Sequence, residues 1–247
     1  MRTLNYYLDN PSHHALWQKV LQGYKEISGR DWQTTAGYRS FWTLCERLHN
    51  LAYGGNLPLP DVLKPSLAFM LGAHAGRVRK GLRERPYFHH ILMVVYLTWL
   101  MRLPITVQLA AIHHDDVEDL PDHLQLSTED VIRILRSLLP PEHAETVIRM
   151  VLNLSNDPKA TSKHEGQMLK MAKVNAETGT LKLLDRIANL YDLQEDKQKR
   201  KNWRDIQRDC ENSWELTTVM PVSADPSVLA MLAFAHHRLA VKNHFAS

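Results

Sequence analysis

The chain has 247 residues, of which 44% are hydrophobic and 23% charged, which is typical of a globular protein that can bury a substantial core. Its formal net charge of +3 is too small to indicate a nucleic-acid-binding protein. The longest apolar run, Ile91–Met101, is too short to cross a bilayer and predicts a buried helix. Cys45 and Cys210 form neither a C-x-x-C motif nor a disulfide framework, and Met1–Pro11 lacks the pattern of a signal peptide. We therefore expect a cytoplasmic protein without a membrane partner.

Sparse glycine, plentiful leucine and alanine and little period-two alternation predict an all-α fold. Apolar residues at helical spacing extend from Pro11 to about Tyr53, and the Gly- and Pro-containing segment Gly54–Pro60 separates them from the rest of the chain. We expect residues 1–60 to form an N-terminal helical extension packed on a main body of residues 61–247.

The main body is predicted to consist of successive helices. They are Lys64–Val78, His89–Arg102, Ile105–Glu118, Asp130–Leu138, Glu142–Leu154, Met168–Asn175, Leu181–Leu193 and Val228–Val241. Ser127 provides an N-cap signal for the helix of Asp130–Leu138. Arg79–Pro86 is predicted to be a basic loop, Asn156–Gln167 a polar loop or helix start, and Glu195–Arg208 a solvated helix face.

Two apolar, helix-favouring segments carry an unusual density of ionisable residues. In the first, His114 and Asp115 are adjacent, and Glu118 and Asp119 follow one turn later. In the second, Asp185 is followed one turn later by Asn189. Burial of so many ionisable groups is costly unless something compensates their charge. A divalent metal ion is the simplest compensation.

His90, His114, Asp115 and Asp185 could together bind one ion. A set of imidazoles and carboxylates without thiolate suits Mn²⁺, Fe²⁺ or Zn²⁺, and its carboxylate share favours Mn²⁺. A bound ion can lower the pKa of water from about 15.7 toward roughly 7, and acidic residues one turn away could orient or deprotonate that water. An adjacent helical residue is turned by about 100°, so His89 and His113 are predicted to point elsewhere.

Each of these residues also has a simpler interpretation when it is taken alone. An isolated His-Asp pair is usually a surface or capping pair, and a lone histidine before an apolar helix is usually a satisfied core or capping residue. The ordered series His90, His114-Asp115, Glu118-Asp119, Asp185 and Asn189, with each member on an apolar segment, is much less expected by accident.

Three stretches of the chain resemble motifs of the HD-domain phosphohydrolases, and within them the hydrolase domain of RelA/SpoT-type proteins. Ala73–His90 is similar to A-H-x-G-Q-x-R-K…P-Y-I-x-H-P, Leu109–Asp119 to A-A-L-L-H-D-T-V-E-D, and Leu181–Leu193 to V-K-L-A-D-R-L-H-N-L-R-D-L. A fourth stretch, Asn156–Glu165, resembles a segment of the single-domain small alarmone hydrolases. The similarity extends from about Lys64 to Leu193.

The resemblance implies an HD-domain helical bundle that removes the 3′-pyrophosphate of the alarmones ppGpp and pppGpp. It implies that the four candidate ligands hold Mn²⁺ and that Glu118 and Asp119 are the catalytic acids. Arg79 and Lys80 would contact the nucleotide, and Asn189 would face its ribose or phosphate side.

Basic residues in or near these motifs suit a polyphosphate, because an ion pair at about 4 Å is worth roughly 4 kcal/mol at an effective dielectric near 20. Further candidate substrate contacts are Arg77, Lys159 and Lys182, with Arg83, Arg85, Lys163 and Arg186 as additional members. A solvated basic loop is the alternative for Arg83 and Arg85. The chain departs from the family pattern at Arg77, which replaces Gln, at Ile91, which replaces Pro, and at Ala188, which replaces His. None of these departures affects a candidate ligand, so the substrate is less defined than the reaction.

Three functions remain as hypotheses. The first is Mn²⁺-dependent hydrolysis of a guanine or adenine alarmone to pyrophosphate and GDP, GTP or the adenine equivalent. The second is another HD phosphohydrolase, acting on a nucleotide or on NADPH. The third is a catalytically silent HD protein that binds an alarmone or a protein partner. We expect no nucleic-acid partner, and the N-terminal extension could serve a homo-oligomer or a protein partner.

Overall fold

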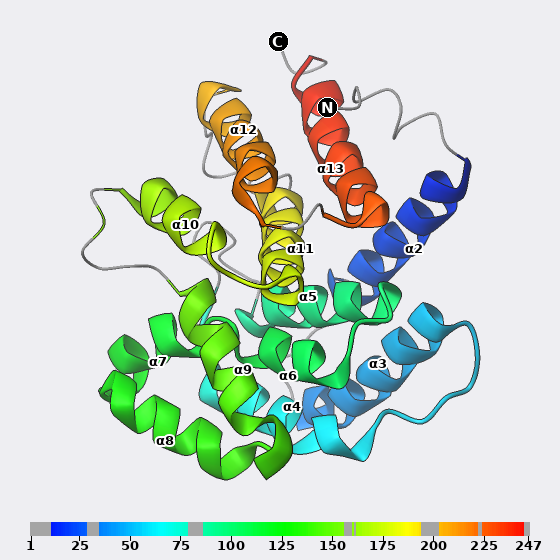
Figure 1. The fold of residues 1–247 in the computed structure, drawn as a ribbon. Coiled ribbons are helices and arrows are strands. Elements are labelled where there is room, and N and C mark those ends of the chain that lie inside the picture. The colour runs from blue at the N-terminus through cyan, green and yellow to red at the C-terminus, as the bar shows by residue number, and fades with distance from the viewer. Residues whose placement is uncertain are drawn as a thin grey trace.

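The computed structural model describes residues 11–28, 35–78, 86–155, 160, 162–193, 203–221 and 224–244. This part of the chain is built of helices, and its only β-type pairing is an isolated antiparallel bridge between Val78 and Pro86. The prediction of an all-α fold is confirmed for this part of the chain (Figure 1). Within the described part, no helix combines the length and apolar character that a membrane span requires.

Helix α5 (Phe88–Leu100) lies at the centre of the molecule. All of its residues are buried, because apolar side chains cover its whole circumference. Helices α6 (Ile105–His113), α11 (Ala176–Leu193), α2 (Pro11–Ser28) and α3 (Thr35–Tyr53) pack directly against it. Any polar side chain on α5 is therefore held in the interior of the protein.

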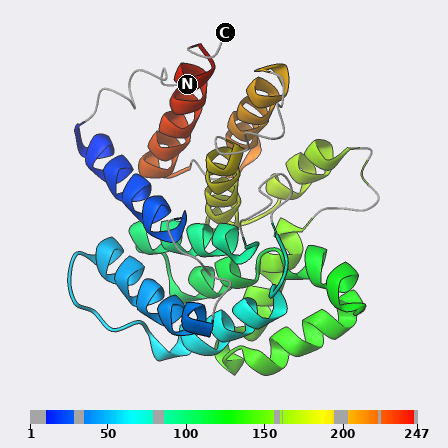
Figure 2. The ribbon, with the colours of Figure 1, turned by 180° about the vertical axis from the view of Figure 1, so that it is seen from behind.

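The other helices lie on two sides of α5, as Figures 1 and 2 show from opposite directions. One side carries α2, α11 and the last two described helices, α12 (Trp203–Val219) and α13 (Pro226–His244). The other side carries α3, α6 and four shorter helices. These are α4 (Lys64–Ala73), which follows the 3-10 turn Asp61–Leu63, α7 (Asp116–Leu124), α8 (Thr128–Leu138) and α9 (Pro141–Leu154).

Helix α2 is joined to the central helix by close packing. A Cβ atom on Gly23 would lie 2.0 Å from Tyr96 Cε1, so only glycine permits this approach. The Tyr96 hydroxyl donates a hydrogen bond to the Lys19 carbonyl at 2.7 Å, and the ring of Trp17 stacks on Phe234 of α13 with centroids 5.1 Å apart. The described residues of the N-terminal helices thus share one core with the main body, and the domain boundary at residue 60 stays a prediction.

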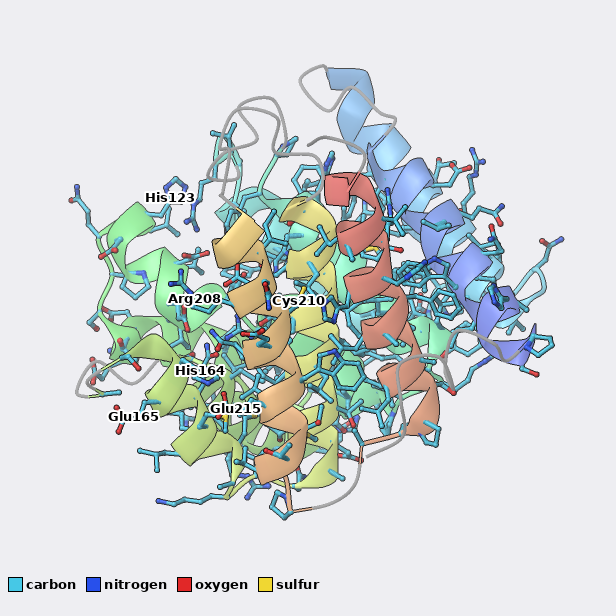
Figure 3. The ribbon with its side chains drawn as sticks, turned by 90° about the horizontal axis from the view of Figure 1, so that it is seen from above. His123, His164, Glu165, Arg208, Cys210 and Glu215 are labelled. Atoms are coloured by element: carbon cyan, nitrogen blue, oxygen red, sulfur yellow. The ribbon has the colours of Figure 1, made fainter. Side chains whose placement is uncertain are left out.

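Helix α10 (Lys163–Met171) is fixed between its neighbours by polar contacts. His164 Nε2 lies 2.8 Å from Glu215 Oε2 of α12 (Figure 3). The Arg186 guanidinium of α11 donates to the Gln167 side-chain carbonyl, and Lys170 Nζ donates to the Ser155 carbonyl at the end of α9 at 2.6 Å. These contacts connect α9, α10, α11 and α12.

Several predicted helix boundaries differ from those observed. The helix predicted over Lys64–Val78 ends at Ala73, because Gly76 adopts a left-handed φ of 74°. The helix predicted over Ile105–Glu118 is two helices, α6 and α7, which are separated by a turn at His114–Asp115. The N-cap at Ser127 is confirmed, since its side chain accepts from the Asp130 N–H in a capping box.

The charged segment Glu195–Arg208 is predicted from the sequence to be a solvated helix face. Its residues 195–202 lie outside the described part, and its last residues belong to α12, which continues to Val219. The buried positions of α12 include Ile206, Cys210, Ser213 and Leu216, a helical spacing that the sequence prediction did not use. The helix predicted over Met168–Asn175 is wrong in its second half, because α10 covers Lys163–Met171 and the chain turns after it; the other predicted helices differ from the observed ones only at their ends.

Candidate metal centre

Three separate parts of the fold bring the four candidate ligands together. His90 lies in the first turn of α5, and Asp185 lies in the middle of α11. His114 and Asp115 lie in the turn between α6 and α7. His90, His114 and Asp185 are buried, whereas the Asp115 side chain is 19% exposed.

The ligand atoms are separated by distances that suit a shared ion. His90 Nε2 and His114 Nε2 are 3.3 Å apart. Asp115 Oδ2 lies 3.3 Å from His114 Nε2 and 3.8 Å from His90 Nε2. Asp185 Oδ1 lies 3.2 Å from His90 Nε2 and 3.8 Å from His114 Nε2. Ligands at about 2.0–2.2 Å from one ion are roughly 3–3.6 Å apart as neighbours in its coordination shell.

His90, His114 and Asp115 form a group in which the ligand atoms all lie within 4.8 Å of one another. Asp185 is close to both imidazoles but is not a member of this group of three. We therefore regard the three-residue group as the geometric centre, and Asp185 as a fourth donor on the side of the imidazoles.

The oxygens beside the Nδ1 atoms of the two histidines favour the tautomer in which Nε2 faces the cluster with a lone pair. His114 Nδ1 lies 2.8 Å from the Ala111 carbonyl, which can only accept, so Nδ1 carries the proton. His90 Nδ1 makes no hydrogen bond to a described residue, but it lies 3.5 Å from Asp192 Oδ2, a carboxylate oxygen that favours a proton on this nitrogen. In neutral rings, both Nε2 lone pairs then point at each other, and neither can donate to the other. A cation between them removes this conflict.

The pKa shifts of the cluster residues also indicate a site that favours positive charge. Burial disfavours the charged form of His114, but Asp115 and Asp185 outweigh it and raise the His114 pKa to about 9. Burial likewise opposes ionisation of Asp115, yet the neighbouring His114 and His90 keep its pKa well below the usual range. The pKa of Asp185 is also lowered, against the effect of burial, chiefly by the charge of Lys182. The carboxylates thus attract positive charge to this position, and a divalent ion that replaces the His114 proton would find two carboxylates and two imidazole nitrogens, a donor set that fits it.

Two residues predicted to contact substrate are directed at Asp185 instead. Lys182 is buried, and its ammonium group donates to Asp185 Oδ2 at 3.0 Å and to the Leu154 carbonyl at 3.3 Å. The Asn189 side-chain amide donates to Asp185 Oδ1 at 2.7 Å. Both residues thus hold the Asp185 carboxylate from α11, one helical turn or less away.

Glu118 and Asp119 lie in the first turn of α7, directly after the turn that carries His114 and Asp115. Both are half-buried. Asp119 Oδ2 lies 3.2 Å from an Arg77 guanidinium nitrogen, so the structure brings Arg77 to a predicted catalytic acid. The break between α6 and α7 means that these acids do not continue the α6 helix, in contrast to the single helix predicted from the sequence.

Several predicted substrate contacts lie outside the described residues. These are Arg79, Lys80, Arg83, Arg85 and Lys159, and the side chain of Lys163. Arg186 is described, and it contacts Gln167 of α10.

The sequence analysis missed three residues at or near the cluster. The Tyr87 hydroxyl donates to Asp115 Oδ2 at 2.7 Å, and Asp192 lies beside His90 Nδ1. The signal for Asp192 was available, because it lies seven residues after Asp185 and so on the same face of α11. Asp116 is completely buried, and the sequence offered no indication that this carboxylate, rather than Asp119, would be enclosed.

Asp116 belongs to a second histidine cluster, next to the candidate metal centre. Its carboxylate lies 2.7 Å from His113 Nδ1 and 3.1 Å from His74 Nε2, and the three side chains are fully buried. Burial opposes ionisation of Asp116, but the hydrogen bonds from His113 and His74 lower its pKa. His113 thus points away from the ion-binding group.

Comparison with known proteins identifies a solved structure with a similar fold. No family model matches the chain, and no curated protein sequence matches it significantly. Among solved structures, the chain is similar to a metazoan ortholog of SpoT that hydrolyses ppGpp, with 18% sequence identity and a TM-score of 0.58. The match covers 76% of this chain and 98% of that one. The likeness concerns the arrangement of the helices, so this chain shares the all-α fold of that protein.

Proposed function

We propose that the chain is a divalent-metal-dependent phosphohydrolase that removes the 3′-diphosphate of ppGpp, pppGpp or the corresponding adenine alarmone. The observation that carries this proposal is the opposed pair of imidazole nitrogens, 3.3 Å apart, with a carboxylate oxygen close to each. The shared fold with a SpoT ortholog supports the reaction class, and the motif resemblance supports the substrate.

In this proposal His90, His114, Asp115 and Asp185 hold the ion, and Mn²⁺ is the metal that best suits their mixed nitrogen and carboxylate set. A bound ion would act as a Lewis acid that neutralises phosphoryl charge and favours ionisation of water. Lys182 and Asn189 would keep the Asp185 carboxylate in place, as their hydrogen bonds of 3.0 and 2.7 Å indicate.

Glu118 and Asp119 would manage the protons of the reaction. An attacking water must lose a proton as its oxygen bonds to phosphorus, and the ribose 3′-oxygen must gain one as its bond to phosphorus breaks. Two carboxyl groups in the first turn of α7, next to the ligand-bearing turn, can accept the first proton and deliver the second. Arg79 and Lys80 would bind the nucleotide, and Lys159 would add to the positive charge around it.

The test is incubation of the protein with ppGpp, pppGpp and the adenine analogue, each with Mn²⁺ and with a chelator, followed by product identification. We expect pyrophosphate and the matching nucleoside 5′-diphosphate or 5′-triphosphate, only with the metal. Orthophosphate from another nucleotide or from NADPH would show a different HD phosphohydrolase. Binding of ppGpp without turnover at any metal concentration would show a silent binding protein.

A further inference from the structure

Arg77 is surrounded on three sides by groups that fix its guanidinium. One terminal nitrogen lies 3.2 Å from His74 Nδ1 and 3.2 Å from Asp119 Oδ2. The guanidinium carbon lies 4.4 Å from the centre of the Tyr87 ring, a cation–π distance. The backbone is fixed as well, since the Tyr87 N–H donates to the Arg77 carbonyl at 2.9 Å.

The contact between Arg77 and His74 depends on the buried carboxylate of Asp116. That carboxylate only accepts, so His74 Nε2, 3.1 Å away, carries the ring proton and donates it. His74 Nδ1 then has a lone pair and accepts from Arg77. Asp116, His74 and Arg77 therefore form a chain of hydrogen bonds, and an ion pair between Arg77 and Asp119 extends it.

Tyr87 connects the same arginine to the candidate metal centre. Its ring lies nearly parallel to that of His74, with centroids 5.1 Å apart and an interplanar angle of 19°. Its hydroxyl donates to Asp115 Oδ2, the oxygen that faces both imidazoles. Arg77 thus touches a predicted catalytic acid directly and a predicted ligand through one aromatic ring.

We propose that Arg77 is a positioning residue that holds the Asp119 carboxylate beside the metal centre, and that its own place is fixed by His74 and Tyr87. This inference rests on the proposed function, because it assigns the held carboxylate to the reaction. It differs from the substrate contact that the sequence suggested for Arg77. The Arg77 side chain is 21% exposed, so its exchange does not open the core.

The two roles predict different kinetics. Loss of a group that binds a substrate phosphate equally in ground and transition states raises KM and spares kcat. Loss of a group that aligns a catalytic carboxylate lowers kcat and spares KM. Lysine supplies the charge of arginine but neither its planar fork nor its stacking surface, so it should fail to replace Arg77 as a positioning group.

The experiment compares Arg77→Ala, Arg77→Lys and Arg77→Gln with the wild-type protein, each loaded with Mn²⁺ and checked for metal content. Arg133→Gln is the matched control, since Arg133 is an exposed arginine that also pairs with an aspartate, Asp130, at 3.2 Å. We expect kcat of the Arg77 variants to fall about tenfold to hundredfold, with KM changed by less than about threefold. Added guanidinium chloride should restore part of the lost kcat in Arg77→Ala. It should leave the kcat of Arg133→Gln unchanged.

A thermal double-variant cycle provides a readout that does not need the substrate. If Arg77 holds Asp119, the loss of Tm in Arg77→Gln combined with Asp119→Asn should be clearly smaller than the sum of the single losses. Additive losses, or a raised KM with unchanged kcat and no guanidinium rescue, would overturn the positioning role and leave the proposed function intact. A wild-type protein that hydrolyses no phosphoester would instead overturn the proposed function, and this role with it.

Discussion

His113 and His114 are neighbours in the sequence, as are Asp115 and Asp116, yet the four side chains are divided between two clusters. In one cluster, Asp116 accepts hydrogen bonds from His113 and His74, and all three side chains are fully buried. In the other, the Nε2 atoms of His90 and His114 face each other among carboxylates at 3.2–3.8 Å. Similar residues thus form two groups side by side, one around a shared carboxylate and one around two opposed imidazole nitrogens.

The difference between the clusters shows how a structural histidine can be distinguished from a ligand. In the Asp116 cluster, each carboxylate oxygen receives a ring nitrogen, so the protein itself pairs this carboxylate, while His113 Nε2 is buried with no hydrogen-bond partner in the described part of the chain. In the other, each imidazole turns Nδ1 toward an oxygen of the protein and Nε2 toward the opposite ring and the carboxylates, where a cation can bind. Both clusters contain histidines and aspartates. They differ in whether the imidazole nitrogens face a shared carboxylate or face each other.

Removal of a ligand should have the largest effect of any single change. Asp115→Ala deletes the carboxylate that lies 3.3 Å from His114 Nε2, so we expect loss of the bound ion together with all measurable hydrolysis. Metal analysis after dialysis and the product assay check this. Asp116→Ala is not a suitable control, because it opens the other cluster. The control is Asp122→Asn, which changes an exposed residue of α7. Retention of one ion per chain in Asp115→Ala would contradict the ligand assignment.

Removal of a catalytic acid should separate chemistry from metal binding. Glu118→Ala should keep the ion and lower kcat by about 10²- to 10⁴-fold, the usual contribution of a general acid or base. The measurements are metal content and kcat in the same preparation. Loss of the ion from this variant would show that Glu118 is a ligand and that its assigned role is wrong.

The Asp116 cluster should matter for stability. Asp116→Asn leaves two fully buried histidines without their shared carboxylate, which should reduce the free energy of unfolding by about 3–5 kcal/mol. Because the pKa of Asp116 is lowered in the folded protein, its contribution is present above the unfolded-state pKa and is lost as pH falls through the folded-state value. Urea unfolding at neutral and acidic pH measures both effects.

Two outcomes test this assignment. The loss of stability on acidification below about pH 4 should be smaller in Asp116→Asn than in the wild-type protein, since that carboxyl no longer titrates. Asp122→Asn should change the free energy of unfolding by less than about 0.5 kcal/mol. Equal stability of Asp116→Asn and the wild type would mean that the cluster has no structural role.

The smallest expected effect concerns the charge behind Asp185. Lys182→Met keeps most of the side-chain volume but removes the ammonium group that donates to Asp185 Oδ2 at 3.0 Å. We expect metal affinity to fall by about 10- to 100-fold, as for other residues that orient a ligand, with the fold retained. Mn²⁺ titration of the chelated protein measures this, and Lys170→Met, which removes another lysine that caps α9, is the matched control. A normal affinity with a raised KM would return Lys182 to the substrate-binding role.

The sequence allowed the helical class and the candidate ligands to be predicted, because His114-Asp115 and Asp185 stand out on apolar helices. It did not allow the break at His114–Asp115 to be predicted, since both flanking segments have helical periodicity. It also gave no sign of Tyr87 or His74 as partners, because their contacts cross between elements that only the folded chain brings together. Arg79 and Lys80 keep their predicted roles as hypotheses, as they lie outside the described residues.

His90 lies at the start of α5, the helix that the other elements enclose on every side. This helix cannot shift without disturbing the core that α2, α3, α6 and α11 build around it. Any free energy released when a cation docks against His90 is therefore transmitted to the global unfolding equilibrium rather than to a local loop. The melting temperature should then report how much of the candidate metal centre is occupied by a cation, even before any substrate is known.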